Sequence, residues 1–269
     1  MIPLPGELDL ETVSSCNRRC PTCLRNSYPN RKAVAGRFGK QERMPEELFY
    51  KVIDDWAAWG LKGAWCNLQH FNEPLQDPRI AKFATYAKAT GAFGKVMMHS
   101  NGDLMTARKA KALDGNIDAI RIALYDEVGG RPMPEEQAAP RRELLSSWFS
   151  KTQLEWTGGG HVITHFSPFA NLQPAVAAVR GLPCRREAQM RMIVDYRGEM
   201  LMCCDDIVGL FNLGNVRDHT VEELWNSPKH IEIMETLSHP GGREAYGYCR
   251  TCPRPDGEWT GTAEWMGKE

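Results

Sequence analysis

The chain of 269 residues lacks any long apolar segment. Its longest apolar run, counting glycine, extends only from Trp56 to Leu61, far short of the roughly 20 residues that a membrane-spanning helix needs. A secretory signal is also missing, because Asp9 and Glu11 stand where such a signal has a basic start followed by an apolar core. We therefore expect a cytoplasmic protein without a membrane partner.

An excess of charge of one sign is absent as well. The chain has 33 Lys and Arg against 34 Asp and Glu, a net charge of -1, whereas binding to a phosphate backbone depends on a basic surplus. This balance argues against nucleic acid as a partner. There is no internal repeat or low-complexity tract, and the content of 42% hydrophobic and 25% charged residues is typical of a compact soluble protein.

Cysteine, by contrast, is plentiful and clustered. In a reducing compartment such cysteines indicate metal ligands or catalytic thiols more than a disulfide framework. The nine cysteines form an N-terminal group, a C-terminal group and one isolated member: Cys16, Cys20 and Cys23; Cys184, Cys203, Cys204, Cys249 and Cys252; and Cys66. Two metal-binding regions are predicted.

Apolar patterning predicts alternating strands and helices in the first two thirds of the chain. Strands are expected at 8–13, 64–68, 95–99 and 119–125, with helices within 44–60, 77–90 and 105–113. Strand-then-helix units form a parallel sheet covered by helices, and the chain before Cys184 has room for about six of them. We expect an α/β fold, a partial (β/α)6 TIM-like barrel.

The pattern changes near residue 170. Short strands at 192–196 and 199–203 flank Gly198, and a helical stretch follows within 221–237. Segments 129–140 and 158–160 are expected to be loops. The predicted division is a partial barrel over 1–170 and a small α+β domain over 171–269.

The N-terminal cysteines form a Cys-x3-Cys-x2-Cys motif directly after the first strand, at the sheet edge where barrel active sites form. Three thiolates can ligate three irons of a 4Fe-4S cluster and leave the fourth open, whereas a closed zinc site needs a fourth ligand that is not nearby. The motif resembles the signature of the radical S-adenosylmethionine (SAM) superfamily.

Two further segments carry the same resemblance. FNEP at 71–74 resembles the superfamily's Gly-Gly-Glu-Pro element, which holds the SAM amino group, and SNG at 100–102 resembles its Thr-Asn-Gly element, near the methionyl or ribose portion. Taken alone they would be a helix-entry turn and a tight turn. The resemblance implies that SAM contacts come from Thr22, Asn72, Glu73, Ser100 and Asn101.

The sequence departs from the superfamily pattern at two positions. Thr22 stands where many members have an aromatic residue, so a contact with adenine there would use its backbone. Ala123 in the fourth strand stands where relatives often have Ser, which removes a hydroxyl contact to SAM; Arg121 is a candidate substitute.

The C-terminal cysteines resemble the ligands of the twitch domain, the shortened form of the SPASM extension of radical SAM enzymes. The resemblance implies an auxiliary 4Fe-4S cluster held by Cys184, Cys203, Cys249 and Cys252. The four-residue gap between Gly198 and Cys203 favours Cys203 over Cys204 as ligand. A four-cysteine zinc site remains the alternative, because Cys-x2-Cys pairs serve both metals.

The resemblance implies two 4Fe-4S clusters, SAM, and an electron donor such as flavodoxin or ferredoxin. A 5'-deoxyadenosyl radical would abstract hydrogen from a small-molecule or peptide substrate. Four thiolates would fill the auxiliary cluster, which suits outer-sphere electron transfer and favours net two-electron oxidation (dehydrogenation) of a small polar molecule. His161, His165 or an Arg are candidate general bases, and none is assigned.

Three alternatives remain open at the level of sequence. The first is a radical epimerase, in which Cys66 or Cys204 returns a hydrogen. The second is an enzyme that modifies a ribosomally made peptide. The third, from a different class, is a zinc-binding interaction protein without catalytic activity.

Overall fold

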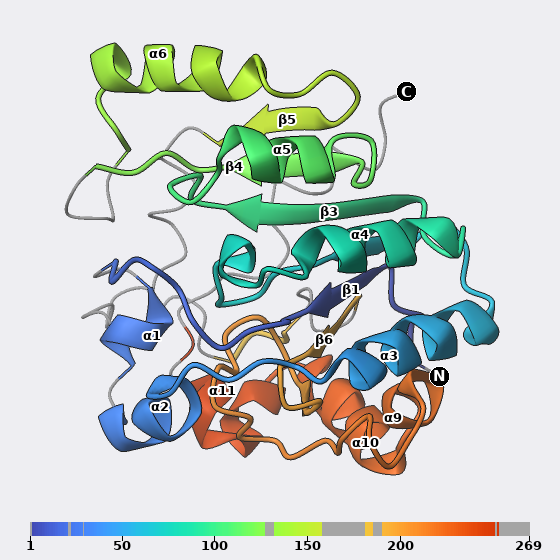
Figure 1. Cartoon of the computed structure of the whole chain (residues 1–269). Helices are drawn as coiled ribbons and strands as arrows, with labels where there is room; N and C mark the ends of the chain where they lie inside the picture. Colours follow the sequence, from blue (N-terminus) through green and yellow to red (C-terminus); the bar gives the residue numbers. More distant parts are fainter. Residues whose placement is uncertain are drawn as a thin grey trace.

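The computed structural model describes residues 2–20, 23–28, 30–126, 132–157, 181–184, 190–250 and 252 (Figure 1). The strands are β1 Glu7–Leu10, β2 Trp65–Asn67, β3 Lys95–Ser100, β4 Ala119–Ile122, β5 Gln153–Trp156, β6 Arg191–Val194 and β7 Met200–Leu201. The helices are α1 Leu24–Ser27, α2 Arg31–Phe38, α3 Glu46–Trp59, η1 Pro74–Gln76, α4 Ile80–Ala89, α5 Ala107–Leu113, α6 Glu135–Ser146, α9 Val221–Trp225, α10 Pro228–Leu237, η3 Gly242–Ala245 and α11 Gly247–Arg250.

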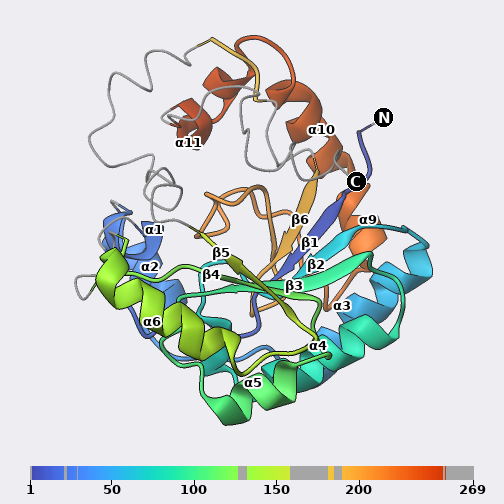
Figure 2. The ribbon, with the colours of Figure 1, turned by 90° about the horizontal axis from the view of Figure 1, so that it is seen from above.

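The strands form one sheet in the order β5-β4-β3-β2-β1-β6-β7. Neighbours from β5 to β6 are parallel, and β7 pairs antiparallel with β6. The sheet is curved and remains open (Figure 2), so the predicted partial barrel is confirmed. In the described part of the chain, five parallel strands precede Cys184, and the sixth, β6, follows it.

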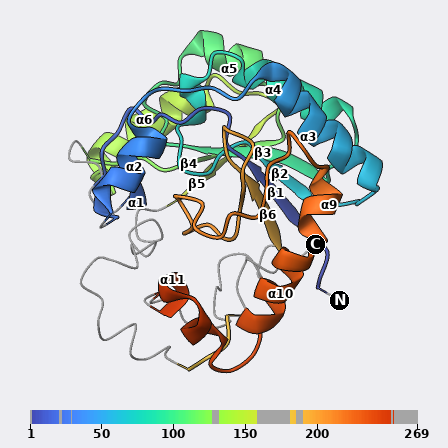
Figure 3. The ribbon, with the colours of Figure 1, turned by 90° about the horizontal axis from the view of Figure 1, so that it is seen from below.

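Helices α3 to α6 cover the convex face of the sheet (Figure 3). Alternation along β1 explains this arrangement, since Leu8 and Leu10 join the core with Val52 and Trp56 of α3 while Asp9 points to the other face. Helix α3 ends at Gly60, whose positive φ of 80° is a left-handed conformation that glycine adopts readily. The charged side chain of β1, Asp9, therefore faces the concave side of the sheet.

One predicted loop is partly wrong. The sequence predicts a loop over 129–140, yet α6 begins at Glu135 and continues through Pro140 to Ser146. Two acids in its first turn favour a helix start, and Ala138 and Leu145 are buried in the core. Tertiary packing therefore outweighs the cost of an internal proline, about 3 kcal/mol.

The predicted helical stretch 221–237 is two helices. Helix α9 begins with a capping box between Thr220 and Glu223, and α10 begins after Ser227, whose side chain accepts a hydrogen bond from the His230 amide. Pro228 takes the first position of α10, where its missing N–H costs nothing. Among the described residues, no helix is both long and apolar enough to span a bilayer.

The β6–β7 hairpin connects the sheet to the C-terminal segment. Its turn is held by Asp195, which accepts hydrogen bonds from the amides of Arg197 and Glu199 at 3.0 and 2.8 Å, and by Gly198 at a φ of 86°. The guanidinium of Arg37 in α2 bonds the carboxylates of Asp195 and Glu199 at 2.5 and 2.6 Å. Because β6 pairs with β1, the sheet continues past residue 170, and the proposed boundary at 170/171 stays a prediction.

Candidate metal and SAM sites

The N-terminal cysteines lie together on the loop between β1 and α1, at the carboxyl edge of the sheet. The Cys23 amide donates to the Cys20 carbonyl at 3.0 Å. Burial, together with the proximity of the other thiols, raises the pKa of Cys16 and that of Cys23, the latter to about 11. Thiolate ligands at these positions therefore require nearby cations, such as the irons of a cluster.

Arg18 ties this loop to the ends of two other strands. Its Nε donates to Asp103 Oδ2 at 2.5 Å, and its Nη1 donates to the main-chain oxygen of Asp126 at 2.7 Å. Asp103 follows β3, and Asp126 follows β4. Asn101 adds a second tie to the same loop, through a hydrogen bond from its Nδ2 to Asn17 Oδ1 at 3.0 Å. The geometry of the cysteine loop is thus set by three strand ends.

Glu73 connects the segment after β2 to the segment after β3. Its side chain is only 2% exposed and accepts hydrogen bonds from Ser100 Oγ at 2.8 Å, the Asn101 amide at 2.9 Å and the Leu75 amide at 3.1 Å. Burial raises its pKa. The Glu73 amide donates to the Ser15 carbonyl at 2.9 Å. Through its main chain and its carboxylate, Glu73 therefore connects the segments that follow β1, β2 and β3; we call this set of bonds the Glu73 brace.

The structure thus brings four of the five predicted SAM residues next to the cysteine loop. Glu73, next to Asn72, bonds Ser15 through its amide, and Asn101, next to Ser100, has its Nδ2 3.9 Å from Cys16 Sγ. Thr22 lies outside the described residues.

Two buried polar atoms in this region test the fit to a ligand. Asn72 Nδ2 and Ser15 Oγ are buried and have no hydrogen-bond partner within the described part of the chain. Buried polar groups of this kind are normally satisfied by another group. The site therefore fits a polar ligand such as SAM.

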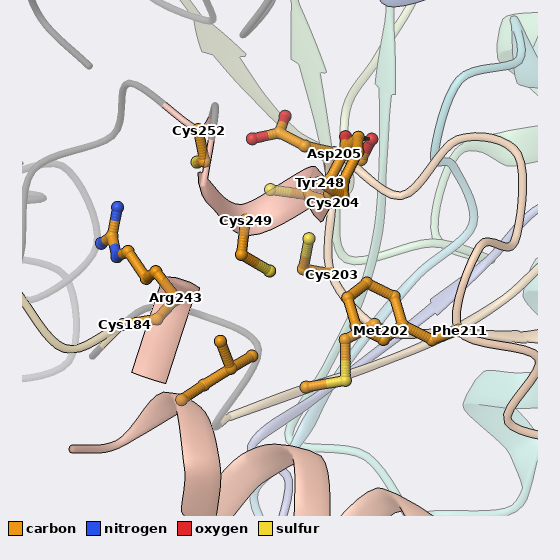
Figure 4. Close-up of a pocket in the computed structure, with 11 residues that line it drawn as sticks. Cys184, Met202, Cys203, Cys204, Asp205, Phe211, Arg243, Tyr248, Cys249 and Cys252 are labelled. Carbon is orange, nitrogen blue, oxygen red and sulfur yellow. Dashed lines mark hydrogen bonds between the residues drawn. The ribbon is translucent and has the colours of Figure 1, made fainter. Parts of the chain in front are cut away.

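The C-terminal cysteines surround a single cavity (Figure 4). It is lined by Cys184, Met202, Cys203, Cys204, Asp205, Phe211, Leu237, Arg243, Tyr248, Cys249 and Cys252. Burial raises the pKa of Cys203 well above its ordinary value and that of Cys249 to about 12, so thiolates here also need metal cations.

Five cysteines line this cavity, one more than the four thiolates that a 4Fe-4S cluster takes. A 4Fe-4S cluster takes one thiolate on each iron and spreads its ligands further than zinc, whose ligands all lie about 2.3 Å from one atom. Cys203 packs against the core together with Cys184 and Cys249.

On the concave face of the sheet, the sequence singled out Arg121 as a candidate SAM contact but not its neighbours His99 and Glu155. The strand register places His99, Arg121 and Glu155 side by side. Arg121 bonds Glu155 Oε2 through Nε at 3.0 Å and lies 3.4 Å from His99 Nε2. Although burial acts in the opposite direction, Lys95 and Arg121 hold the pKa of Glu155 below its ordinary value. The period-two spacing of Lys95, Met97 and His99 is the signal that indicates this face.

The structure also locates the isolated thiol and the candidate bases. Cys66 is fully buried in the core on the convex side of the sheet, away from the face that carries His99. His161 and His165 lie outside the described residues.

Comparison with known proteins agrees with the C-terminal cysteine site and with the fold. Residues 184–253 match the SPASM iron-sulfur cluster-binding domain. The fold matches the crystal structure of BtrN in complex with AdoMet and 2-DOIA, with a TM-score of 0.69, 16% identity, and coverage of 96% of this chain and 95% of that one. It also matches native anSMEcpe with bound AdoMet, with a TM-score of 0.58, 15% identity, and coverage of 93% and 89%.

In its fold and in its C-terminal domain the chain is similar to radical SAM enzymes of the SPASM type, as the motifs predicted. Among curated proteins the chain is similar to the S-adenosyl-L-methionine-dependent 2-deoxy-scyllo-inosamine dehydrogenase of Niallia circulans. It is 18% identical over 249 residues, which cover 91% of each protein.

Proposed function

We propose that this chain is a radical SAM dehydrogenase that removes two hydrogens from a small polar molecule. The observation that carries the proposal is the pairing of two unlike cysteine sites, an open three-cysteine loop and a cavity lined by five cysteines. The first leaves one iron for SAM, and the second has enough thiols to ligate every iron of its cluster. The curated relative that matches 91% of the chain is a SAM-dependent dehydrogenase.

At the first site, Cys16, Cys20 and Cys23 would hold the cluster, and Asn72, Glu73, Ser100, Asn101 and the Thr22 backbone would contact SAM. When bound there, cluster and SAM supply a single-electron cleavage that yields methionine and a 5'-deoxyadenosyl radical. The chain's own contribution is placement: the Glu73 brace and the Arg18–Asp103 pair keep the loops in one geometry. Flavodoxin or ferredoxin is the proposed electron donor.

At the second site, Cys184, Cys203, Cys249 and Cys252 would hold a cluster that supplies an electron acceptor. Oxidation of an alcohol to a ketone also requires that a proton leave the substrate. A proton acceptor has to face the concave side of the sheet, where His99 lies beside Arg121. His99 therefore joins His161 and His165 as a candidate base.

The test is anaerobic turnover of reconstituted protein with SAM, a strong reductant and 2-deoxy-scyllo-inosamine or another polyhydroxylated amine. We expect 5'-deoxyadenosine and a product lighter by two hydrogens in equal amounts. A product of unchanged mass would indicate an epimerase, and a cross-linked or oxidised peptide in parallel incubations would indicate peptide modification. Absence of 5'-deoxyadenosine with every substrate would contradict the proposal.

Metal content supplies an independent check. A brown protein with about eight irons per chain agrees with two clusters. A colourless protein that contains zinc would instead support the zinc-binding alternative.

A further inference from the structure

One hydrogen bond joins the predicted SAM-binding segment directly to the second cysteine site. His70, on the loop after β2 and two residues before Asn72, has its Nε2 3.2 Å from the main-chain oxygen of Cys204. A carbonyl oxygen can only accept, so Nε2 carries the proton and donates. The Cys204 carbonyl belongs to the residue that directly follows Cys203, one of the proposed ligands.

The neighbouring residue fixes the position of this imidazole. The rings of His70 and Phe71 meet edge to face with centroids 4.3 Å apart. The Phe71 amide donates to Glu11 Oε1 at 3.1 Å, and its carbonyl accepts from Arg25 Nη1 at 3.1 Å. Because both the amide and the carbonyl of Phe71 are hydrogen-bonded, the main chain is held at this residue, and the His70 ring packs against the Phe71 ring.

Phe71 also packs into a small hydrophobic cluster that is separate from the main core. Its members come from the segments that carry both cysteine sites: Leu24, Tyr28, Val34 and Ile207, with Phe38, Phe71, Val208 and Tyr248 packed against them. Leu24 follows Cys23 in sequence, and Tyr248 precedes Cys249. This cluster therefore holds the two cysteine-bearing segments against each other, with the His70–Phe71 pair between them.

We propose that His70 is a positioning residue that couples the two cysteine sites: its imidazole N–H holds the Cys203–Cys204 segment and sets the reduction potential of the cluster bound there. This inference rests on the proposed function. Reduction adds negative charge to a cluster, and a hydrogen-bond donor directed at the surrounding peptide stabilises that charge in a poorly solvated cavity. Partners of this kind tune the potentials of iron-sulfur sites.

The experiment is potentiometric EPR on the anaerobic holoenzyme, comparing wild type with His70→Phe and His70→Gln. The signal that changes on addition of SAM identifies the first cluster, which serves as an internal reference. Phenylalanine keeps the ring that packs on Phe71 and lacks the donor, whereas glutamine keeps a donor of similar reach. His239→Phe, at an exposed histidine at the end of α10, is the matched control.

We expect His70→Phe to make reduction of the second cluster roughly tenfold less favourable, an effect within the range for loss of one hydrogen bond. For a one-electron couple, tenfold corresponds to a midpoint about 59 mV lower. His70→Gln and His239→Phe should stay close to wild type, and the first cluster should not shift. Loss of the second cluster from His70→Phe with its retention in His70→Gln would likewise support positioning by the hydrogen bond.

Two results would overturn the inference: a second-cluster midpoint in His70→Phe that equals the wild-type value, or a shift in His70→Gln as large as that in His70→Phe. These results leave the proposed function untouched. If wild-type protein never assembled a second cluster, the proposed function itself would fail, and the role of His70 with it.

Discussion

The two cysteine sites are built in opposite ways. The first takes three cysteines from eight consecutive residues on one loop, within a network of polar side chains from three strand ends. The second collects five cysteines from segments that are up to 68 positions apart in sequence (184 to 252) and surrounds a largely apolar cavity. An open, polar site suits the binding and cleavage of a charged cosubstrate, whereas a closed, apolar one suits electron storage.

The comparison also shows where the two sites meet. His70 bonds the Cys204 carbonyl of the second site. The Phe71 carbonyl accepts from Arg25, two residues after Cys23 of the first site. Arg37 makes a second connection between the segment after the cysteine loop and the β6–β7 hairpin. The two sites are built from different kinds of segments, yet the same side-chain contacts connect the segments that carry them.

Removing the first site is the change with the largest expected effect. The triple substitution Cys16→Ala, Cys20→Ala and Cys23→Ala should reduce 5'-deoxyadenosine formation by roughly 10³-fold or more, because no cluster remains to reduce SAM. Iron should fall from about eight to about four per chain. Cys66→Ala, in the core, is the control and should keep both. If the triple variant still cleaved SAM, the first cysteine site would not be the place where SAM is cleaved.

Removing one ligand of the second site should separate SAM cleavage from product formation. In Cys203→Ala we expect about four irons to be lost and oxidised product to fall by roughly 100-fold or more, while 5'-deoxyadenosine still forms. Cys204→Ala should keep both iron and product. Iron analysis and product mass measure the two effects. If Cys204→Ala loses the cluster and Cys203→Ala retains it, the ligand assignment is wrong.

A substitution at Glu11, which accepts a hydrogen bond from the Phe71 amide, tests the region between the two cysteine sites. Burial, with a further contribution from Asp195, raises its pKa to about 8, so the folded state holds a proton that the unfolded chain releases near pH 4.5. The resulting stability is complete below about pH 4.5, declines as the pH rises above that value, and is fully lost above about pH 8. Glu11→Gln mimics the protonated form and should be more stable than wild type at pH 7 by roughly 3 kcal/mol.

Thermal unfolding at pH 5 and pH 7.5 measures this difference. We expect the variant and wild type to have similar midpoints at pH 5, and the variant to unfold on the order of 6 °C higher or more at pH 7.5. Parallel pH profiles for the two proteins would mean that Glu11 is ionised in the folded state.

Glu73→Gln is the change with the smallest expected effect. The amide group can accept through one oxygen only, so one of the donors Ser100 Oγ and the Asn101 amide loses its acceptor. We expect SAM to bind roughly tenfold more weakly, measured by equilibrium dialysis with reconstituted protein. Glu47→Gln, at an exposed position of α3, is the control. Unchanged affinity would show that the brace is dispensable.

Much of the barrel could be predicted from the sequence. The strands β1 to β4 and helices α3 to α5 were found because their apolar residues recur with the period of a strand or of a helix packed on one face. Helix α6 was partly missed because Gly129, Gly130 and Pro140 locally favour a loop, while the burial of Leu145 that stabilises the helix depends on a distant surface.

For the sites, the sequence by itself determined the cysteine triad, since eight consecutive residues carry its spacing wherever the loop lies. It also determined the strand-end positions of Glu73 and Asn101. Only the tertiary structure decided that Glu73 bonds both Ser100 and Asn101, that Cys204 lines the same cavity as the four predicted ligands, and that His70 reaches Cys204. These contacts depend on strand register and on packing between remote segments, and no local spacing in the chain encodes them.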